Sequence, residues 1–109
     1  MPRKSKPASA PHSICAWRLT RRYTVAHLAE LTGLSIASIS RIENGKQPYT
    51  QRSLEAIASV LKCDVGDLLV RHLTPEQMEL RDALRDITGA NARRMIRVLH
   101  ALTEPEVIP

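Results

Sequence analysis

The chain has 109 residues, which is the length of a single domain. Aromatic residues make up only 3% and phenylalanine is absent, so the core must be aliphatic, which suits short packed helices better than a sheet. A net charge of +5 makes polyanions the natural class of partner. No apolar run approaches the roughly 18 residues of a membrane span, and no signal-peptide core follows the basic start, so we expect a soluble cytoplasmic protein without membrane contact.

The amino-terminal segment is basic and poor in apolar side chains. Residues 1–12 hold three prolines, small polar residues and three positive charges, with nothing able to bury surface. This composition predicts a disordered basic arm. Six basic residues precede the first acidic residue, Glu30, so the positive charge of this part of the chain is expected to be free of internal neutralisation: Arg3, Lys4, Lys6, Arg18, Arg21 and Arg22.

Two short helices are predicted after the arm. From Ser13 onwards, apolar residues recur at helical spacing and indicate a first helix that ends near Arg21. Thr24 is a good N-cap for a second helix, and Gly33 is suited to end it. The residues expected to face the core are Ile14, Trp17 and Leu19 in the first helix and Val25, Leu28, Ala29 and Leu31 in the second.

A third short helix follows closely. Ser35 is its N-cap, and Asn44-Gly45 is a pair suited to a left-handed turn after its last residue. The second and third helices are separated only by residues 33–35, and two short helices so connected form a helix-turn-helix pattern. A fourth helix from about Gln51 to Lys62 and a single turn capped by Asp64 complete a compact bundle of five helices.

Two further helices are predicted near the carboxyl end. Thr74-Pro75-Glu76-Gln77 combines an N-cap, a proline at the first position and a capping box, so a sixth helix should begin here and run to about Thr88, where Gly89 ends it. The end of the chain, residues 104–109, is expected to fray. The two helices carry apolar stripes that need a partner surface: Leu80, Leu84 and Ile87 in the sixth, and Met95, Ile96, Leu99 and Leu102 in the seventh.

The segment LAELTGLSIASISRIENGKQP, residues 28–48, resembles the lambda-repressor and Cro-like family of regulators, also called the XRE family. The resemblance extends over roughly Ser13 to Val70 and includes the run ISRIENGK at residues 39–46. It implies an all-α fold in which a five-helix, repressor-type helix-turn-helix domain binds DNA. We therefore divide the chain into a basic arm at 1–12, a DNA-binding domain at 13–73, and a C-terminal helical hairpin and tail at 74–109 that are expected to serve dimerisation.

The third helix would be the recognition helix. Ile39 and Ile42 point to one side of it, whereas another side carries only small or polar residues and fits the major groove, which admits one helix: Ala37, Ser40, Arg41 and Asn44. Arg41 can fork two donors onto a guanine, which makes it our best candidate for base readout. The family pattern also places base readers at Ile36 and Ala37, where apolar contact with thymine methyl groups is one interpretation. For Ile36, burial in the core is an equal alternative.

Other residues are candidates for phosphate contacts, which supply affinity without direct sequence information. Asn44 and Lys46 match family positions near phosphates. The further candidates are Arg22, Ser35, Gln47 and Tyr49, while Arg52 is more simply a solvated surface residue. The arm residues Arg3, Lys4 and Lys6 could enter a minor groove or follow phosphates.

The sequence offers no sign of catalysis, a metal or a cofactor. Cys15 and Cys63 lack metal-ligand spacing and are interpreted as core residues of a reduced intracellular protein. The four histidines are isolated from one another, and no nucleophile-base pair or phosphate-binding loop is present. Glu30 and Glu43 are expected to brace the helix pair. We therefore predict that the chain is not an enzyme.

The leading hypothesis is a transcriptional regulator, a repressor that binds a palindromic operator in double-stranded DNA as a homodimer. The alternative is an antitoxin or another protein-interaction module that grips a partner protein through residues 74–102. A helix-turn-helix that has lost DNA binding is disfavoured by Arg41, Asn44 and Lys46. The two C-terminal stripes could fold back on the domain, pack against each other or pair across a two-fold axis, and the last explains best how a short recognition helix gains enough affinity.

Overall fold

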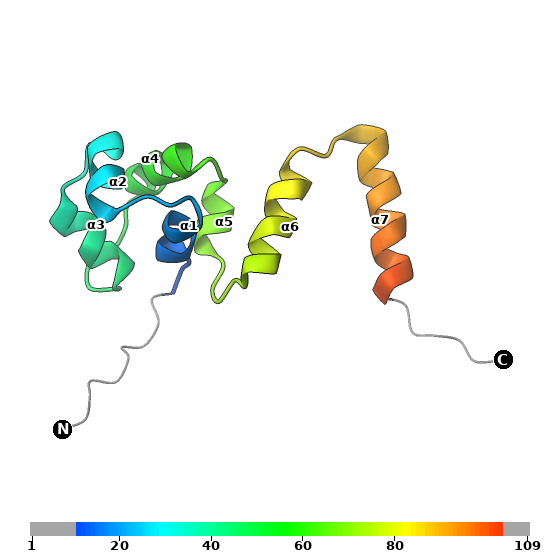
Figure 1. Ribbon diagram of the computed structural model, residues 1–109, viewed down its shortest axis with the longest axis horizontal. Helices are drawn as coiled ribbons and strands as arrows, with labels where there is room; N and C mark the ends of the chain where they lie inside the picture. The colour runs from blue at the N-terminus through cyan, green and yellow to red at the C-terminus, as the bar shows by residue number, and fades with distance from the viewer. Residues whose placement is uncertain (1–10, 104–109) are drawn as a thin grey trace, which may run out of the picture.

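The computed structural model describes residues 11–103, and every regular element in that range is a helix (Figure 1). The predicted all-α fold is therefore confirmed. In chain order the helices are α1 (Ile14–Thr20), α2 (Val25–Thr32), α3 (Ile36–Glu43), α4 (Gln51–Leu61), α5 (Val65–Leu69), α6 (Pro75–Arg85) and α7 (Gly89–Thr103).

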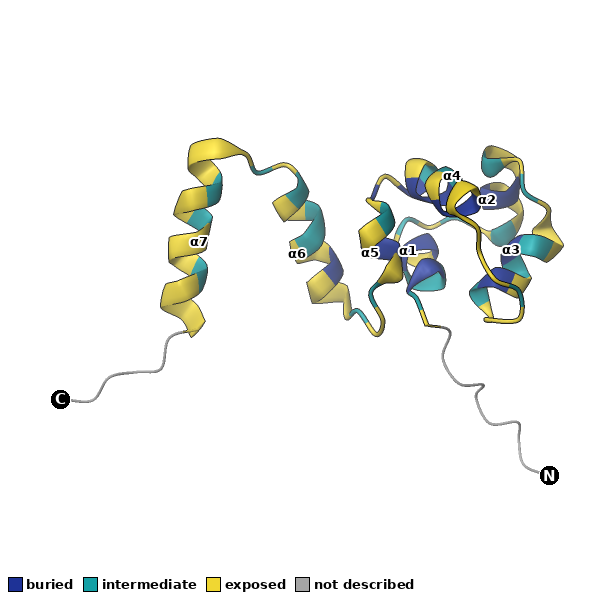
Figure 2. Ribbon diagram, turned by 180° about the vertical axis from the view of Figure 1, so that it is seen from behind, coloured by how far each residue is buried: buried dark blue, intermediate teal, exposed yellow. Residues whose placement is uncertain are grey.

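Helices α1 to α5 enclose the aliphatic core, and we call residues 13–70 the body. Trp17 is the only aromatic side chain in the buried cluster, as the composition requires, and it is fully buried. The other fully buried side chains come from all five helices: Ile14, Leu28, Ile39, Ile57, Leu61 and Leu68. Figure 2 shows this burial concentrated where α1, α2, α4 and α5 meet.

Two residues predicted to lie in the core are exposed instead. Leu19 is 60% exposed and Leu31 is 49% exposed. On α1 the core-facing positions belong to Trp17 and to the buried Arg18, which turns Leu19 away from the core. On α2 the buried face is centred on Leu28 and Ala29, and Leu31 lies beyond its edge.

The boundary between α6 and α7 differs from the predicted one. The capping box at Thr74 and Gln77 is present, but α6 ends at Arg85 rather than at about Thr88. The prediction that Gly89 ends the sixth helix is wrong, because Gly89 is the first residue of α7 and has a φ of 54°. The carbonyl of Thr88 already accepts a hydrogen bond from the Asn91 N–H at 3.1 Å, so the next helix begins here.

The two C-terminal helices relate differently to the body. Met78 of α6 is 3% exposed and belongs to the same buried cluster as the body. Within the part of the chain that the structure describes, α7 buries no residue at all (Figure 2). The division into a domain that ends at residue 73 and an extension that starts at 74 stays a prediction.

Candidate nucleic-acid interface

Caps and one glycine define the ends of α2 and the start of α3. The Thr24 hydroxyl accepts a hydrogen bond from the His27 N–H at 3.0 Å, and the Ser35 hydroxyl accepts one from the Ser38 N–H at 2.9 Å. Gly33 ends α2 with a φ of 81°, a conformation that side chains other than glycine adopt only at a cost. These local choices confirm the predicted boundaries and present α3 at a fixed angle to α2.

Helix α3 has one buried and one outward face. Ile39 and Ile42 are 0% and 2% exposed, whereas Ile36 is 55% exposed, so the alternative that placed Ile36 in the core is wrong. At 3.6 residues per turn the remaining predicted base readers share the outward side with Ile36. Ala37, Arg41 and Asn44 are exposed there, and Ser40 is half-buried.

The loop after α3 folds back onto the helix. Gly45 has a φ of 74°, and the backbone N–H groups of Lys46 and Gln47 both donate to the carbonyl of Arg41, at 2.8 and 3.2 Å. The Arg41 Nε in turn donates to the Gln47 side-chain oxygen at 2.9 Å. The structure thus brings Arg41, Lys46 and Gln47 together, and this bond occupies only one of the five donors of the guanidinium.

His12 joins the end of the predicted arm to this loop. Its Nδ1 accepts a hydrogen bond from the Ile14 N–H at 3.5 Å, so the neutral ring carries its proton on Nε2 and donates it to the Ile42 carbonyl at 3.0 Å. The ring also meets Tyr49 edge-on, with the centroids 5.8 Å apart. Partial burial lowers the pKa of His12, which favours this neutral form.

His12 was predicted to belong to the disordered arm, and it is instead half-buried beside the loop after α3. A hollow of about 410 Å³ lies at this junction, lined by Pro11, His12, Gly45, Lys46, Gln47, Pro48 and Tyr49. The arm residues Arg3, Lys4 and Lys6 lie outside the described residues, as does the tail at 104–109.

Two predicted phosphate contacts lie away from the loop after α3. Arg22 is exposed in the turn between α1 and α2 and has a φ of 64°. The hydroxyl of Ser35 is engaged as the N-cap of α3, although the residue itself is exposed.

A buried ion pair ties α3 to α1. Arg18 donates to both carboxylate oxygens of Glu43, at 2.6 and 3.0 Å, and also to the Tyr23 carbonyl at 2.8 Å. Hydrogen bonding to Glu43 raises the pKa of Arg18 above its usual value. Glu43 therefore braces α3 against α1 rather than α2 against α3, and no ion pair of Glu30 is found within residues 11–103.

The expectation of unneutralised positive charge is wrong for two of the six residues. Arg18 is paired with Glu43, and Arg21 is paired with Asp82 of α6 through two contacts of 2.8 and 2.9 Å. The sequence reasoning missed both pairs because their partners lie 25 and 61 residues away along the chain.

The described residues contain no arrangement suited to a metal or a membrane span. Over residues 11–103, no group of three or more His, Cys, Asp or Glu side chains is placed to hold a metal ion. No helix in that range is long and apolar enough to cross a membrane. Cys63 is buried and Cys15 is half-buried, and both are free thiols.

The comparisons with known proteins agree with this geometry. The family model of the Cro/C1-type HTH DNA-binding domain matches residues 18–72, about half of the chain. An uncharacterised HTH-type transcriptional regulator, YozG of Bacillus subtilis (strain 168), is 40% identical over 50 residues, which cover 45% of this chain and 60% of YozG.

Two solved structures share the fold. A chain of the complex between the SinR protein and the SinI protein is 26% identical, with a TM-score of 0.55 over 84% of this chain and 95% of that one. The clp gene regulator ClgR from Corynebacterium glutamicum is 22% identical, with a TM-score of 0.51 over 85% of this chain and 88% of that one, which shows likeness of fold alone.

Proposed function

This chain belongs to the family of Cro/C1-type helix-turn-helix DNA-binding domains, and on that premise we propose that it is a sequence-specific transcriptional regulator. It binds a palindromic operator as a homodimer and acts as a repressor, since occupying an operator requires only a DNA-binding surface and a dimer surface. The observation that carries the proposal is the division of α3 into a face of buried isoleucines and a face of exposed small and polar residues.

The outward face of α3 reads the bases in this proposal. Arg41 donates from its terminal nitrogens to a guanine in the major groove, a contact worth about 1–3 kcal/mol against the wrong base. The Gln47 side chain holds the Arg41 Nε and so limits the directions in which the guanidinium can point. Ile36 and Ala37, exposed at the start of the helix, contact thymine methyl groups, and Ser40 bonds to a neighbouring base.

Residues around this face hold the phosphates. Asn44 and Lys46 lie directly after α3, and Gln47 and Tyr49 continue the same loop. Arg22 and the amino end of α3 at Ser35 make further contacts with the backbone. His12 lies beside Lys46 and Tyr49. In this proposal the basic residues Arg3, Lys4 and Lys6 add contacts with a minor groove or with phosphates.

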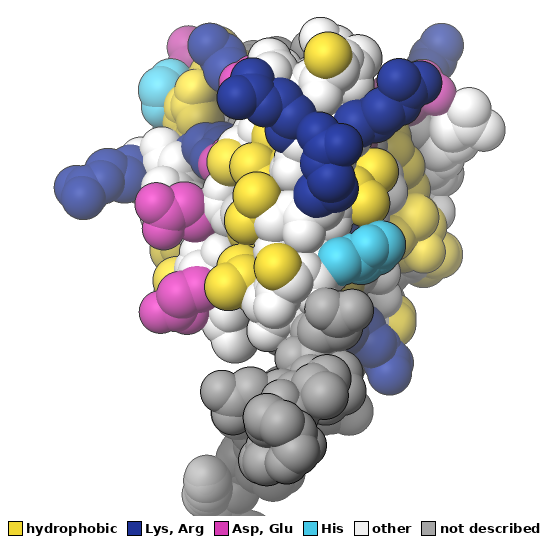
Figure 3. Space-filling view, turned by 90° about the vertical axis from the view of Figure 1, so that its right-hand side faces the viewer, with side chains coloured by type: hydrophobic (Ala, Val, Ile, Leu, Met, Phe, Trp, Pro, Cys, Tyr) yellow, Lys and Arg dark blue, Asp and Glu magenta, His cyan; other side chains and the backbone are white. Residues whose placement is uncertain are grey.

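The dimer forms through α6 and α7. Leu80 and Leu84 of α6 are 46% and 38% exposed, and Ile96 and Leu102 of α7 are 50% and 75% exposed, which is unusual for a monomer on adjacent helices. Figure 3 shows apolar side chains beside basic ones on the side of the molecule where α7 lies.

Charge supports a second copy of this chain as the partner of these helices. Helix α7 carries three arginines and no acidic residue. Helix α6 carries Glu76 and Glu79, which are exposed and form no ion pair with any residue of 11–103. The α7 helix of one copy therefore complements the α6 helix of the other in both apolar surface and charge.

Selection of bound duplexes from a random DNA pool, at a stated salt concentration, tests DNA binding by the full chain. We expect an enriched inverted repeat, with an affinity that falls steeply as salt rises because several phosphate contacts release counterions. A pool that stays random after repeated selection would refute the proposal, and so would an affinity that is the same at low and high salt.

The mass in solution tests the dimer. We expect the full chain to be a dimer at micromolar concentration, and Ile96→Asp to weaken dimerisation at least about tenfold because it places a charge in the apolar interface. The substitution should not unfold the body, since α7 buries no residue. Leu31→Asp is the matched control, because Leu31 is equally exposed but lies on α2. A monomeric wild-type chain, or equal weakening by both substitutions, would contradict the assignment.

A protein-binding function is the second candidate. The solved complex of SinR with SinI shows that a chain of similar fold takes part in a complex with another protein. In this alternative, residues 74–102 bind a partner protein, as an antitoxin binds a toxin. A wild-type chain that is monomeric and binds no DNA alone would favour it over the homodimeric repressor.

A further inference from the structure

Two arginines three residues apart connect α1 and its C-cap to the recognition helix and to α6. Arg18 holds Glu43 at the end of α3, while Arg21 holds Asp82 of α6 with both terminal nitrogens. Arg21 also donates through Nε to the Leu61 carbonyl at 2.6 Å, so its side chain is fixed at the α4 end as well. One charged contact therefore joins α3 to α1, and a second joins the end of α1 to α6.

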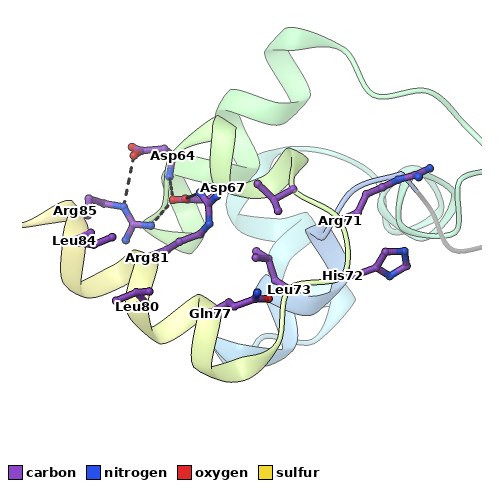
Figure 4. A pocket seen from close by; sticks show the side chains of 11 residues that line it. Asp64, Asp67, Arg71, His72, Leu73, Gln77, Leu80, Arg81, Leu84 and Arg85 are labelled. Carbon is purple, nitrogen blue, oxygen red and sulfur yellow. Dashed lines mark hydrogen bonds and ion pairs between the residues drawn. The ribbon is translucent and has the colours of Figure 1, made fainter. Parts of the chain in front are cut away.

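One face of α6 packs against the body, and most of its side chains are charged. Met78, Arg81, Asp82 and Arg85 follow the i, i+3, i+4, i+7 spacing of a single helix face. Arg81 donates to Asp67 at 2.8 Å, and Arg85 donates to Asp67 and, at 2.7 Å, to Asp82. Figure 4 shows Arg81 and Arg85 reaching from α6 towards Asp64 and Asp67 of the body.

The buried Trp17 ring supports the same arginines. The guanidinium carbon of Arg21 lies 5.0 Å from the ring centroid and that of Arg85 lies 5.9 Å from it, distances at which a cation is attracted to the ring face. The indole N–H donates to the Asp67 carbonyl at 3.1 Å. Trp17, Arg21, Arg85, Asp67 and Asp82 form one network, and Arg81 joins it through its ion pair with Asp67.

The carboxylates of this network are ionised at neutral pH. Hydrogen bonds from Arg21 lower the pKa of Asp82 to about 2. Burial opposes the ionisation of Asp67, but a backbone hydrogen bond and the two α6 arginines outweigh it and keep its pKa below the usual value. The contacts that hold α6 are thus charge-assisted under ordinary conditions.

Small changes in the direction of α6 have large consequences at the DNA. Met78 alone would leave α6 free to pivot about one apolar contact. A helix of 11 residues is about 16 Å long, so a tilt of about 12° moves its far end by about 3.4 Å, the rise of one base pair. The network around Asp82, one turn beyond Met78, removes this freedom.

We propose that the network of Arg21, Asp82 and Arg85 sets the separation between the two DNA half-sites that the dimer accepts. The inference rests on the proposed function, because it requires a dimer joined through α6 and α7. The direction in which α6 leaves each body then decides the distance and the relative rotation of the two α3 helices. None of the three residues contacts DNA in our account, so they are positioning residues.

The test compares the duplexes that full-length variants select from a random pool, scored by the separation of the inverted half-sites. The wild-type chain should enrich one separation, near one turn of DNA, about 10 base pairs. Asp82→Asn should enrich the same half-site sequence at two or more separations within about threefold of each other in frequency. Each added base pair moves a half-site by about 3.4 Å and turns it by about 35° about the DNA axis, and an α6 that can tilt and rotate accommodates both changes. Asp86→Asn, an equal loss of charge on an exposed residue outside the network, should behave as wild type.

Several outcomes would overturn the inference. A single wild-type separation selected by Asp82→Asn would show that the network does not set the spacing, and a changed half-site sequence would show that it acts in base reading instead. Broadening by Asp86→Asn as well would assign the effect to net charge. If the wild-type chain enriches no inverted repeat, the proposed function itself fails, which is a distinct result.

A second variant keeps the test valid if Asp82→Asn does not fold. Arg81 is 39% exposed at the rim of the network, and Arg81→Gln removes only its pair with Asp67. It should broaden the selected separations less than Asp82→Asn while the dimer mass stays unchanged. A folded Arg81→Gln dimer with the wild-type separation, in the absence of a folded Asp82→Asn, would overturn the inference.

Discussion

The body and the helix docked on it are held by different chemistry. Inside the body, aliphatic side chains and Trp17 form one cluster of buried residues. Across the junction between the body and α6, one methionine is buried, and every ion pair joins an arginine to an aspartate, with side chains a fifth to a third exposed at Arg21 and Asp82. Hydrophobic burial therefore stabilises the fold of the body, and ion pairs set the orientation of α6 on it.

This difference means that the fold of the body is constant, whereas the orientation of α6 can change with conditions. Apolar burial is insensitive to pH and responds weakly to moderate salt, whereas partly exposed ion pairs weaken with added salt or with loss of one charge. The orientation of α6 is thus the part of the structure that conditions can alter while the recognition helix stays intact.

The largest effect is expected inside the body, at its one buried ion pair. Arg18→Ala leaves Glu43 buried without a counter-charge and should lower the free energy of unfolding by about 3–5 kcal/mol. Arg52→Ala, at an exposed position on α4, should change it by less than about 0.5 kcal/mol. Denaturant unfolding measures both, and a similar small loss in the two variants would mean that the pair does not stabilise the body.

Substitutions on the buried face of α3 should lower the stability of the protein, and substitutions on its exposed face should weaken DNA binding. Ile39→Ala removes a fully buried side chain and should cost about 2–5 kcal/mol. Ile36→Ala, at an exposed position, should cost less than about 0.5 kcal/mol yet weaken binding to the selected DNA site. Thermal melts and DNA titrations of both variants check this. Equal destabilisation by the two substitutions would place both isoleucines in the core.

Asp82→Asn should loosen α6 without unfolding the body. Partly exposed ion pairs contribute up to about 1 kcal/mol, so global stability should fall by no more than that. Hydrogen exchange should accelerate in the amides of α6 while those of α4, which lie in the aliphatic core, keep their protection. Loss of protection in α4 to the same degree would show that α6 and the body unfold as one unit.

The smallest expected effect is the response of the junction to acid. The folded-state pKa of Asp82, about 2, lies below the ordinary aspartate pKa of 3.8, so its contribution is present above pH 4 and is lost as the pH falls from about 4 towards 2. Fluorescence of Trp17, the only tryptophan, should report the departure of Arg21 and Arg85 from its ring in that window.

Asp82→Asn serves as the control for the acid response, because it lacks the carboxylate that titrates. Its Trp17 fluorescence should already differ at neutral pH, and its change between pH 4 and 2 should be smaller than that of the wild-type chain. An identical acid transition in the two proteins would show that other carboxylates control the environment of Trp17.

Local signals were enough to predict the helix-turn-helix. The caps Thr24 and Ser35 and the turn residues Gly33 and Gly45 act through neighbours at most four residues away, so the sequence alone defines the ends of α2 and α3. The outward positions of α3 followed from helical periodicity, and all of them except the half-buried Ser40 are exposed as predicted, which leaves their contacts with DNA as a prediction.

Contacts between distant charged residues could not be predicted in this way. Arg18 occupies a core-facing position of α1, a face that the apolar pattern assigns partly to Leu19. On α6 the apolar pattern indicates the stripe of Leu80 and Leu84, which is exposed, and not the charged face that packs against the body. The spacing of Arg81, Asp82 and Arg85 around Met78 was visible in the sequence, but their partners on α1 and α5 depend on the tertiary fold.

Base readout by α3 is the central claim, and one comparison tests it most directly. The wild-type chain and Arg41→Ala are each used to select duplexes from the same random pool at the same salt concentration. The account predicts that Arg41→Ala melts like the wild-type chain, because the side chain is exposed, and that it loses the preference at one base pair of each half-site while keeping the others. Unchanged preferences at every position, or uniformly weaker binding to all sequences, would contradict the claim and assign Arg41 to the phosphate backbone or to the surface.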